Sequence, residues 1–323
     1  MIRIFSCKVN DKDISSYVIS YQWQGDVDQA GRKLDFSIAY NTKDTVFVNQ
    51  NIIVGDIVYL YYTDDNMTDA TPIEIFRGVI FMRQRNTANF TFEFVAYDRL
   101  IYFAKSKTTR KFSNITVESV IQQVANEMNI EIGGICDIGI YVDFIADNMS
   151  CTEIIKRAFN MAYWQNAKQY HMYMNQDKLY VIERSETIEN YIASDTVNVE
   201  ATNHSESIED MINTVMIVDN NGAEIGSVSN ASDLAAYGKL QDVYKLDSKQ
   251  DTQTAAKALL KTVAFKSSLS GIGNVQCITG YAIVIQEEQL KGKFTIRSDH
   301  HSISGNIHKM ELDLEFLEVV SCA

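Results

Sequence analysis

The sequence of 323 residues is poor in residues that form linkers and cross-links. Its single proline, Pro72, excludes Pro-rich linkers. Five cysteines are scattered without a CxxC pair, at Cys7, Cys136, Cys151, Cys277 and Cys322. An odd number of dispersed cysteines is typical of reduced thiols. We therefore expect neither a disulfide framework nor a zinc site.

Long apolar runs are also missing. The sequence contains no run of about 18 apolar residues and does not open with a charged, apolar and small-residue signal peptide. We therefore expect synthesis in the cytoplasm and no membrane insertion. If the protein is found outside a cell, we expect it to leave as part of a particle.

Positive charge is scarce, with 42 acidic against 29 basic side chains and a net charge of −13. An acidic surface repels phosphate, so we expect no specific nucleic-acid binding. Two segments are locally basic, Lys105–Lys111 and Lys291–Arg297, but neither interleaves aromatic residues over a broad patch. We interpret both as solvated or interface faces.

Aromatic and β-branched residues are abundant, with 17 Tyr and 15 Phe against 2 Trp. This composition favours strands, and the length allows two or three domains. The expected fold class is α+β and mostly β. Its expected parts are an N-terminal β-barrel domain in 1–105, a mixed α/β middle domain in 106–205, and a C-terminal β domain with a helical insertion in 206–323.

Hydrophobic periodicity places the elements. Strands are predicted in six N-terminal runs: Arg3–Val9, Tyr17–Trp23, Leu34–Tyr40, Ile52–Tyr62, Ile75–Arg83 and Phe90–Tyr97. Helices are predicted in 114–129, 150–164 and 252–265, the second opening with a capping box. Hairpins are predicted at 169–183, at 214–228 and around the turn at 305–306. The acidic stretch 185–206 is interpreted as a connector.

Histidines gather near the last predicted turn, where His300, His301 and His308 flank it beside Asp299. Neighbouring strand residues point to opposite faces, so at most one of His300 and His301 can lie beside His308. Because a metal site needs converging ligands, we interpret these residues as hairpin packing and predict no metal ligands.

Catalytic patterns are weak. The paired carboxylates at 64–65 and 287–288 are adjacent in loops, and no GxSxG, HExxH or Walker loop is present. Gly271-x-Gly273 lacks the third glycine of a dinucleotide fingerprint, and nothing in the sequence places a base beside Cys151. We predict no catalytic and no cofactor-binding residues.

The order of motifs resembles the baseplate hub proteins of contractile phage tails. Residues 74–130 contain a hairpin, the exit Tyr97-Asp98-Arg99 and an amphipathic helix. Residues 149–184, 207–219 and 297–318 follow in the order of that family, which is the late-control-protein D-like group with the prophage XkdQ-YqbQ-like proteins. The final segment, RSDHHSISGNIHKMELDLEFLE, resembles the closing element of the family.

This resemblance implies a structural role in a bacterial phage tail or tail-like particle. Two tail-tube-like β-barrel domains per subunit would assemble as a homotrimer that joins the sixfold tail tube to the threefold central spike and lines the channel. Its partners would be the tube, the spike and other baseplate proteins. The motif residues would be architectural: Tyr97, Asp98, Arg99, Tyr237, Gly238, His301, Gly305, Asn306, His308 and Met310.

Several alternatives stay open. A cell-wall hydrolase could use carboxylates of the middle region, and a carbohydrate-binding component could use exposed tyrosines. The negative charge could line the channel or could only keep the chain soluble. In the first case the basic residues Lys105, Lys107, Arg110 and Lys111 are expected away from the lumen, at contacts with neighbouring proteins. The particle could be a DNA-carrying phage or a DNA-free tailocin.

Overall fold

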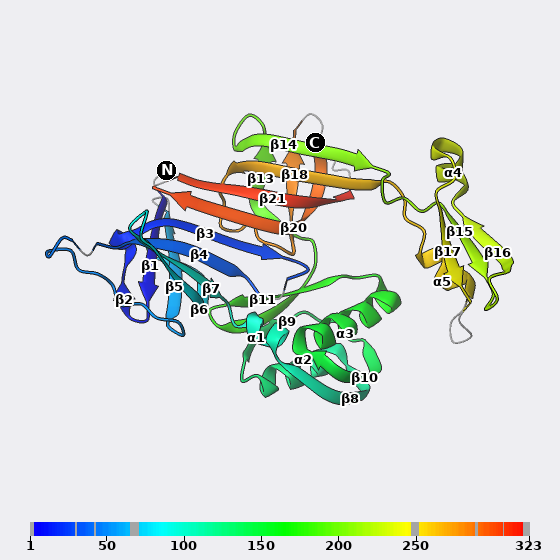
Figure 1. Ribbon diagram of the computed structural model, residues 1–323, viewed down its shortest axis with the longest axis horizontal. Coiled ribbons are helices and arrows are strands. Elements are labelled where there is room, and N and C mark those ends of the chain that lie inside the picture. The colour runs from blue at the N-terminus through cyan, green and yellow to red at the C-terminus, as the bar shows by residue number, and fades with distance from the viewer. Residues whose placement is uncertain are drawn as a thin grey trace. The chain divides into compact units, whose positions relative to one another are not determined.

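A computed structural model describes residues 3–29, 31–41, 43–64, 71–246, 252–287, 290–305 and 307–318 (Figure 1). The chain divides into two compact units. The large unit contains Met1–Thr202 and Ser268–Ala323, and the small unit contains Asn203–Ser267. Strands predominate over helices in the described residues, which confirms the prediction of a mostly β, α+β fold.

The N-terminal strands form one antiparallel region of the large unit in the order β3-β4-β7-β6-β5-β1-β2. They are β1 (Arg3–Val9), β2 (Lys12–Asp13), β3 (Val18–Asp26), β4 (Lys33–Ala39), β5 (Ile57–Asp64), β6 (Ile73–Asn86) and β7 (Thr91–Tyr97), with a 3-10 turn at Ser15–Tyr17. In β4 the alternation predicted from sequence is present, because Leu34, Phe36 and Ile38 are buried against the core.

The last strands join the same sheet. They are β13 (Glu186–Ser194), β14 (Val199–Ser207), β18 (Ala264–Ile272), β19 (Tyr281–Gln286), β20 (Lys291–Ser304) and β21 (Ile307–Glu318). β20 pairs with β21 along its length, while its two halves have different partners on the other edge. Lys291–Thr295 pair with β19 and Ser298–Ser304 pair with β3.

This shared strand changes two predictions. Separate β-barrels were predicted, but no sheet of the described residues closes into a barrel. The reason is that β20, with a register shift between Ile296 and Ser298, carries the hydrogen bonding from the N-terminal strands to the C-terminal ones. The predicted connector at 185–206 is wrong as well, since β13 pairs with β19 and β14 with β18.

The middle region of the large unit is mixed. Its elements are α1 (Leu100–Lys105), β8 (Lys107–Thr116), α2 (Val117–Glu127), β9 (Glu131–Ile135), β10 (Tyr141–Ser150), α3 (Cys151–Asn166), β11 (Tyr170–Asn175) and β12 (Lys178–Glu183). Thr116 caps α2, and Ser150 with Glu153 forms the predicted capping box of α3. The apolar faces of both helices pack into one core with β8, β10 and β12.

The small unit is a three-stranded sheet in the order β16-β15-β17 with two short helices. Its elements are β15 (Thr214–Val218), β16 (Glu224–Ser229), α4 (Ala231–Tyr237), β17 (Gln241–Lys245) and α5 (Thr252–Ala258). The predicted hairpin at Asn221-Gly222 is confirmed. The helix predicted for 252–265 ends early, because residues from Ala264 onward belong to β18 and pair in a sheet.

Candidate functional site

A buried ion pair joins the beginning and the end of the chain. Arg32, just before β4, is 9% exposed, and Asp299 of β20 is 1% exposed. The guanidinium donates from Nη1 to Oδ1 at 2.8 Å and from Nη2 to Oδ2 at 2.5 Å, a two-pronged contact. Burial alone would raise the pKa of Asp299, but the Arg32 charge and hydrogen bonds hold it below its usual value. Asp299 is therefore ionised and paired.

Thr279 completes the set of donors to this carboxylate. Its backbone N–H and its hydroxyl donate to Oδ1 of Asp299 at 2.7 and 2.6 Å. A buried charge without such partners would cost several kcal/mol. The ion pair therefore fixes three segments together: the β3–β4 connection, the loop before β19, and β20.

Asp98 extends the joint to the middle region. It directly follows β7, is 2% exposed, and accepts hydrogen bonds from the backbone N–H groups of Arg32 and Leu100, each at 3.0 Å. Burial raises the pKa of Asp98 to about 7. Gly31 has a φ of +120°, and a Cβ there would lie 2.7 Å from Oδ1 of Asp98. The glycine lets the backbone approach this carboxyl group.

Two histidines of the last hairpin lie beside the ion pair. Nδ1 of His301 is 3.1 Å from Nε2 of His308, and Nε2 of His301 is 3.0 Å from the carbonyl oxygen of Cys277. A carbonyl can only accept, so Nε2 of neutral His301 donates to it, and Nδ1 accepts from His308. Burial lowers the pKa of His301 to about 4, which keeps the imidazole neutral.

Trp23 covers this histidine pair. Its ring stacks on His301 with centroids 4.4 Å apart and planes 7° apart. On another side, a Cβ at Gly273 would lie 2.2 Å from the ring of His308. Glycine is required at 273 by this close approach. We call the set of Trp23, Arg32, Asp98, Asp299, His301 and His308 the buried joint.

β11 of the middle region also packs beside the joint, through His171. Gly280 has a φ of +95°, and a Cβ there would approach the ring of His171 to 2.6 Å. Burial lowers the pKa of His171 to about 3, with the charges of Arg184 and Arg32 acting in the same direction. The neutral imidazole of His171 therefore lies within the field of the joint.

The other motif residues of the large unit are placed near the joint but make separate contacts. Nη1 of Arg99 lies 3.1 Å from Oδ2 of Asp177, which links α1 to the β11–β12 turn. Tyr97 packs edge-on against Phe81. Met310, opposite His301 in the β20–β21 register, is buried in the core.

Two predicted positions form turns, and one lies outside the described residues. Gly305 has a φ of +59° after β20, whereas Asn306 is outside the described residues. In the small unit, Gly238 ends α4 with a φ of +78°, and its carbonyl accepts from the Asn213 side chain at 2.6 Å. Tyr237 is 45% exposed. The small-unit motif is thus not part of the joint.

Sequence reasoning missed two members of the joint. Asp98, Asp299, His301 and His308 were named, but Trp23 and Arg32 were not, and neither was His171 beside the joint. Arg32 and Asp299 are 267 positions apart, and no local pattern connects them. The one available signal was the glycine directly before Arg32, since glycine is needed where the backbone takes a positive φ.

The polar groups of the joint hold segments of the fold together. Its carboxylates and imidazoles are buried and engaged by protein groups. Among the described residues, no group of three or more His, Cys, Asp or Glu side chains is arranged to hold a metal ion. In the same part of the chain, no helix is long and apolar enough to cross a membrane.

A cleft of about 760 Å³ lies next to the joint in the large unit. Trp23 and Arg32 line it from the joint. Its walls carry aromatic and acidic side chains, among them Tyr62, Tyr173, Tyr281, Glu74, Glu186 and Glu189. The hydroxyl groups of Tyr173 and Tyr281 are 3.2 Å apart.

Comparisons with known proteins agree with this architecture. The XkdQ protein of the phage-like element PBSX from Bacillus subtilis (strain 168) is 25% identical over 327 residues, covering 97% of either chain. The 43 kDa tail protein of prophage MuSo2 from Shewanella oneidensis shares the fold with a TM-score of 0.73 at 12% identity, over 97% of this chain and 98% of that one.

A more distant structural match is a chain of the half-lidded Francisella PdpA–VgrG complex. Its TM-score is 0.54 at 10% identity, over all of this chain and 60% of that one. The family model described as YQBQ-like matches residues 21–315, which is most of the sequence. The resemblance to phage-tail proteins seen in the sequence is thereby confirmed, and the chain belongs to the YQBQ-like family.

Proposed function

We propose that this protein is a structural hub of a contractile tail or injection-particle baseplate and catalyses no reaction. In this proposal three copies form a ring that connects the sixfold tail tube to the threefold central spike and lines the channel. The protein would be made in the bacterial cytoplasm and assembled into the particle. The family membership and the fold shared with a prophage tail protein support a structural role in a tail.

The observation that carries the proposal is the fusion of two β regions into one sheet. β20 hydrogen-bonds to β3 of the N-terminal region and to β19 of the C-terminal region. The buried joint adds an ion pair and a histidine pair across the same boundary. A subunit built this way carries two β regions in fixed relation, so three subunits present six β regions around a threefold axis.

We assign different roles to the three parts proposed from sequence, 1–105, 106–205 and 206–323. The β regions of the first and third parts would contact the tube, and the motif residues would fix the register of their strands. Tyr97, Asp98 and Arg99 end the N-terminal strands, and Gly305 begins the turn before the final strand. The Francisella complex contains VgrG, and this supports a spike-like partner for the ring.

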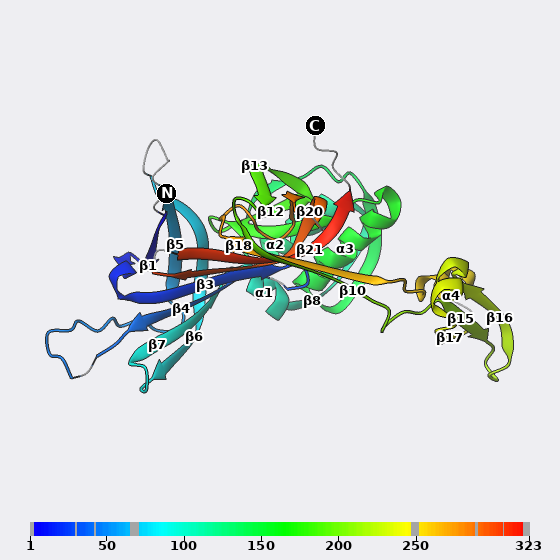
Figure 2. The same ribbon diagram turned by 90° about the horizontal axis from the view of Figure 1, so that it is seen from above.

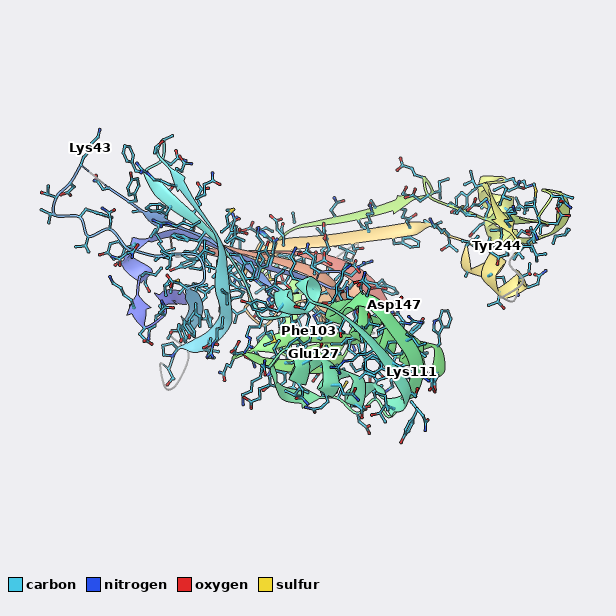
Figure 3. The ribbon with its side chains drawn as sticks, turned by 60° about the horizontal axis from the view of Figure 1, so that its bottom comes forward. Lys43, Phe103, Lys111, Glu127, Asp147 and Tyr244 are labelled. Atoms are coloured by element: carbon cyan, nitrogen blue, oxygen red, sulfur yellow. The ribbon has the colours of Figure 1, made fainter. Side chains whose placement is uncertain are left out.

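Charge supports a passive conduit. With a net charge of −13 per chain, a ring of three repels phosphate over roughly 8–10 Å in physiological salt. The basic residues of the middle region do not form one positive patch. Arg110 pairs with Glu127 at 2.7 Å, and exposed Lys111 shares the β8–β10 ribbon with Asp147 (Figure 3). We place these residues at contacts with neighbouring proteins, away from the lumen.

The test is the mass of the purified protein in solution, alone and mixed with the spike protein of the same particle. Sedimentation should give three times the chain mass of 36.6 kDa, or a complex with the spike. A chain that stays monomeric under both conditions contradicts the hub. Release of muropeptides from purified peptidoglycan would contradict the absence of catalysis and favour a wall hydrolase.

A further inference from the structure

One strand of the large unit extends past its neighbour and leaves an open edge. β6 pairs with β5 only as far as Val79, and Ile80 then bonds to the backbone of Gly55 and Asp56. From Met82 to Asn86, β7 is the one strand of the described residues that pairs with β6. Figure 2 shows the turn of this β6–β7 hairpin at a free end of the ribbon.

The open segment is exposed on both faces. Phe81 and Met82 are 40% and 42% exposed, and the next three residues are exposed as well. An unpaired strand edge offers backbone N–H and C=O groups to any extended segment that approaches it. The segment contains no proline, and the large unit therefore has a site for strand addition.

Two arginines make this edge positively charged, so it favours an acidic partner. The guanidinium of Arg83 lies 4.4 Å from the ring centroid of Phe92, and that of Arg85 lies 4.9 Å from the centroid of Tyr40. Stacking on aromatic rings orients both groups while leaving their N–H donors available. No carboxylate of the described residues forms an ion pair with either arginine. The hairpin is therefore preorganised for an acidic partner.

The same chain has a complementary surface in its cleft. Among the strands that the structure describes, β13 pairs only with β19, and this pairing is interrupted between Thr187 and Ile192. Glu186 and Glu189 of β13 line the cleft of about 760 Å³ together with Tyr62 and Tyr173. This volume falls in the range of clefts that bury a ligand, roughly 300–1,000 Å³. The cleft combines an acidic wall, aromatic side chains and an incompletely paired strand.

Ring symmetry requires two different surfaces that fit each other. Around a threefold axis each contact is head-to-tail, so a patch on one copy meets another patch on the next. A basic projecting hairpin and an acidic cleft on one chain meet this requirement. The local attraction between the arginine edge and the acidic cleft opposes the repulsion between two copies that each carry a net charge of −13.

We propose that the β6–β7 hairpin of one copy enters the cleft beside β13 of the next copy. Arg83 and Arg85 then pair with Glu186 and Glu189 of the neighbour, and the open edge of β6 gains backbone partners. The proposal rests on the ring proposed above and names the contact that closes it.

The experiment is a charge swap read by sedimentation over a concentration series. R83E/R85E and E186R/E189R should each weaken self-association at least about tenfold. The combination of all four substitutions in one chain restores opposite charges across the contact and should restore assembly. K239E/K245E is the matched control, because it changes the net charge by the same amount as R83E/R85E at two exposed lysines of the small unit that the proposed contact does not use, and it should assemble like wild type.

Hydrogen exchange on the same samples tests the backbone contact. Those amides of residues 82–86 that point away from β7 should exchange slowly in assembled wild type and rapidly in R83E/R85E, whereas those bonded to β7 are protected in both. If wild type assembles but the variants match K239E/K245E, or the fourfold variant is not restored, this contact is wrong while the ring stands. If wild type is monomeric at every concentration and with the spike present, both proposals fail.

Discussion

The residues of the buried joint favour one pairing of the strands over others, and burying them costs free energy of desolvation. A bidentate Arg32–Asp299 pair taken out of water gains little net stability over an apolar pair of the same shape. It does, however, penalise any packing that leaves either charge without its partner. The hydrogen bond between His301 and His308 acts similarly, because the Nδ1 atom of His301 accepts from His308 only in this arrangement of the two rings. Correct pairing of β20 with β3 is thereby favoured over shifted registers.

Histidine burial predicts a loss of stability in acid. The pKa of His301 is about 4 in the fold against 6.5 for an ordinary histidine, so between these values the unfolded chain binds the proton first. Stability from His301 is present above pH 6.5 and is lost as the pH falls toward 4. The pKa of Asp98 is raised to about 7 in the fold, against 3.8 for an ordinary aspartate. Protonation of Asp98 therefore stabilises the fold as the pH falls from 7 to 3.8, which opposes the effect of His301.

We expect His301→Gln to reduce the drop in melting temperature between pH 7.5 and pH 5, because it removes the imidazole whose protonation favours the unfolded chain. The measurement is thermal unfolding at both pH values, and His300→Gln serves as the control on the neighbouring strand position. An equal drop in His301→Gln and wild type would show that protonation of His301 does not limit the fold.

At the level of elements, side-chain caps and strand partners determine where helices and strands end. The α3 helix begins at Cys151 because Ser150 accepts from the N–H of Glu153 and the Glu153 carboxylate accepts from the N–H of Ser150. The α5 helix ends at Ala258, although the apolar spacing continues, because Lys261 forms a β-bridge with Ile212 and the chain enters β18 at Ala264. Helix starts are thus local features here, whereas this helix end is set by a distant partner.

Loss of the α3 cap should destabilise the large unit measurably. Ser150→Ala removes the acceptor for the Glu153 N–H and should cost about 1 kcal/mol of unfolding free energy. Urea unfolding followed by circular dichroism measures this change. Ser113→Ala, at an exposed position of β8, should stay within about 0.5 kcal/mol of wild type, and equal effects of the two substitutions would contradict the capping role.

At the level of the whole molecule, the two units differ in the size of their cores. The small unit buries four hydrophobic residues in its cluster: Val215, Ile217, Val228 and Ala256. The large unit contains three larger clusters. A small core stabilises its unit less, so the small unit should unfold first.

We therefore expect two calorimetric transitions that respond to different substitutions. Ile217→Ala should lower the first transition, because it removes buried volume worth about 2–5 kcal/mol from the small unit. Ile283→Ala, buried in the large unit, is the matched substitution and should lower the second transition. A single transition that shifts equally with both would mean that the units unfold together.

The sequence by itself determined those features that depend on neighbours within a few positions. Hydrophobic periodicity predicted the hairpin around the turn at 305–306, and the capping box at Ser150 and Glu153 predicted the start of α3. Strand alternation also predicted that at most one of His300 and His301 can lie beside His308, and the structure shows that this residue is His301. In each case the physical cause is the fixed geometry of a strand, a helix turn or a hairpin.

The tertiary structure alone decided how these elements combine. The β regions form one open sheet because one half of β20 pairs with β19 and the other half with β3. The pairing with β3 joins segments that are far apart in the sequence. The pairing of Arg32 with Asp299 depended on burial that removes water from both groups. Local spacing carries no information about such contacts, because they arise only when distant segments are desolvated together.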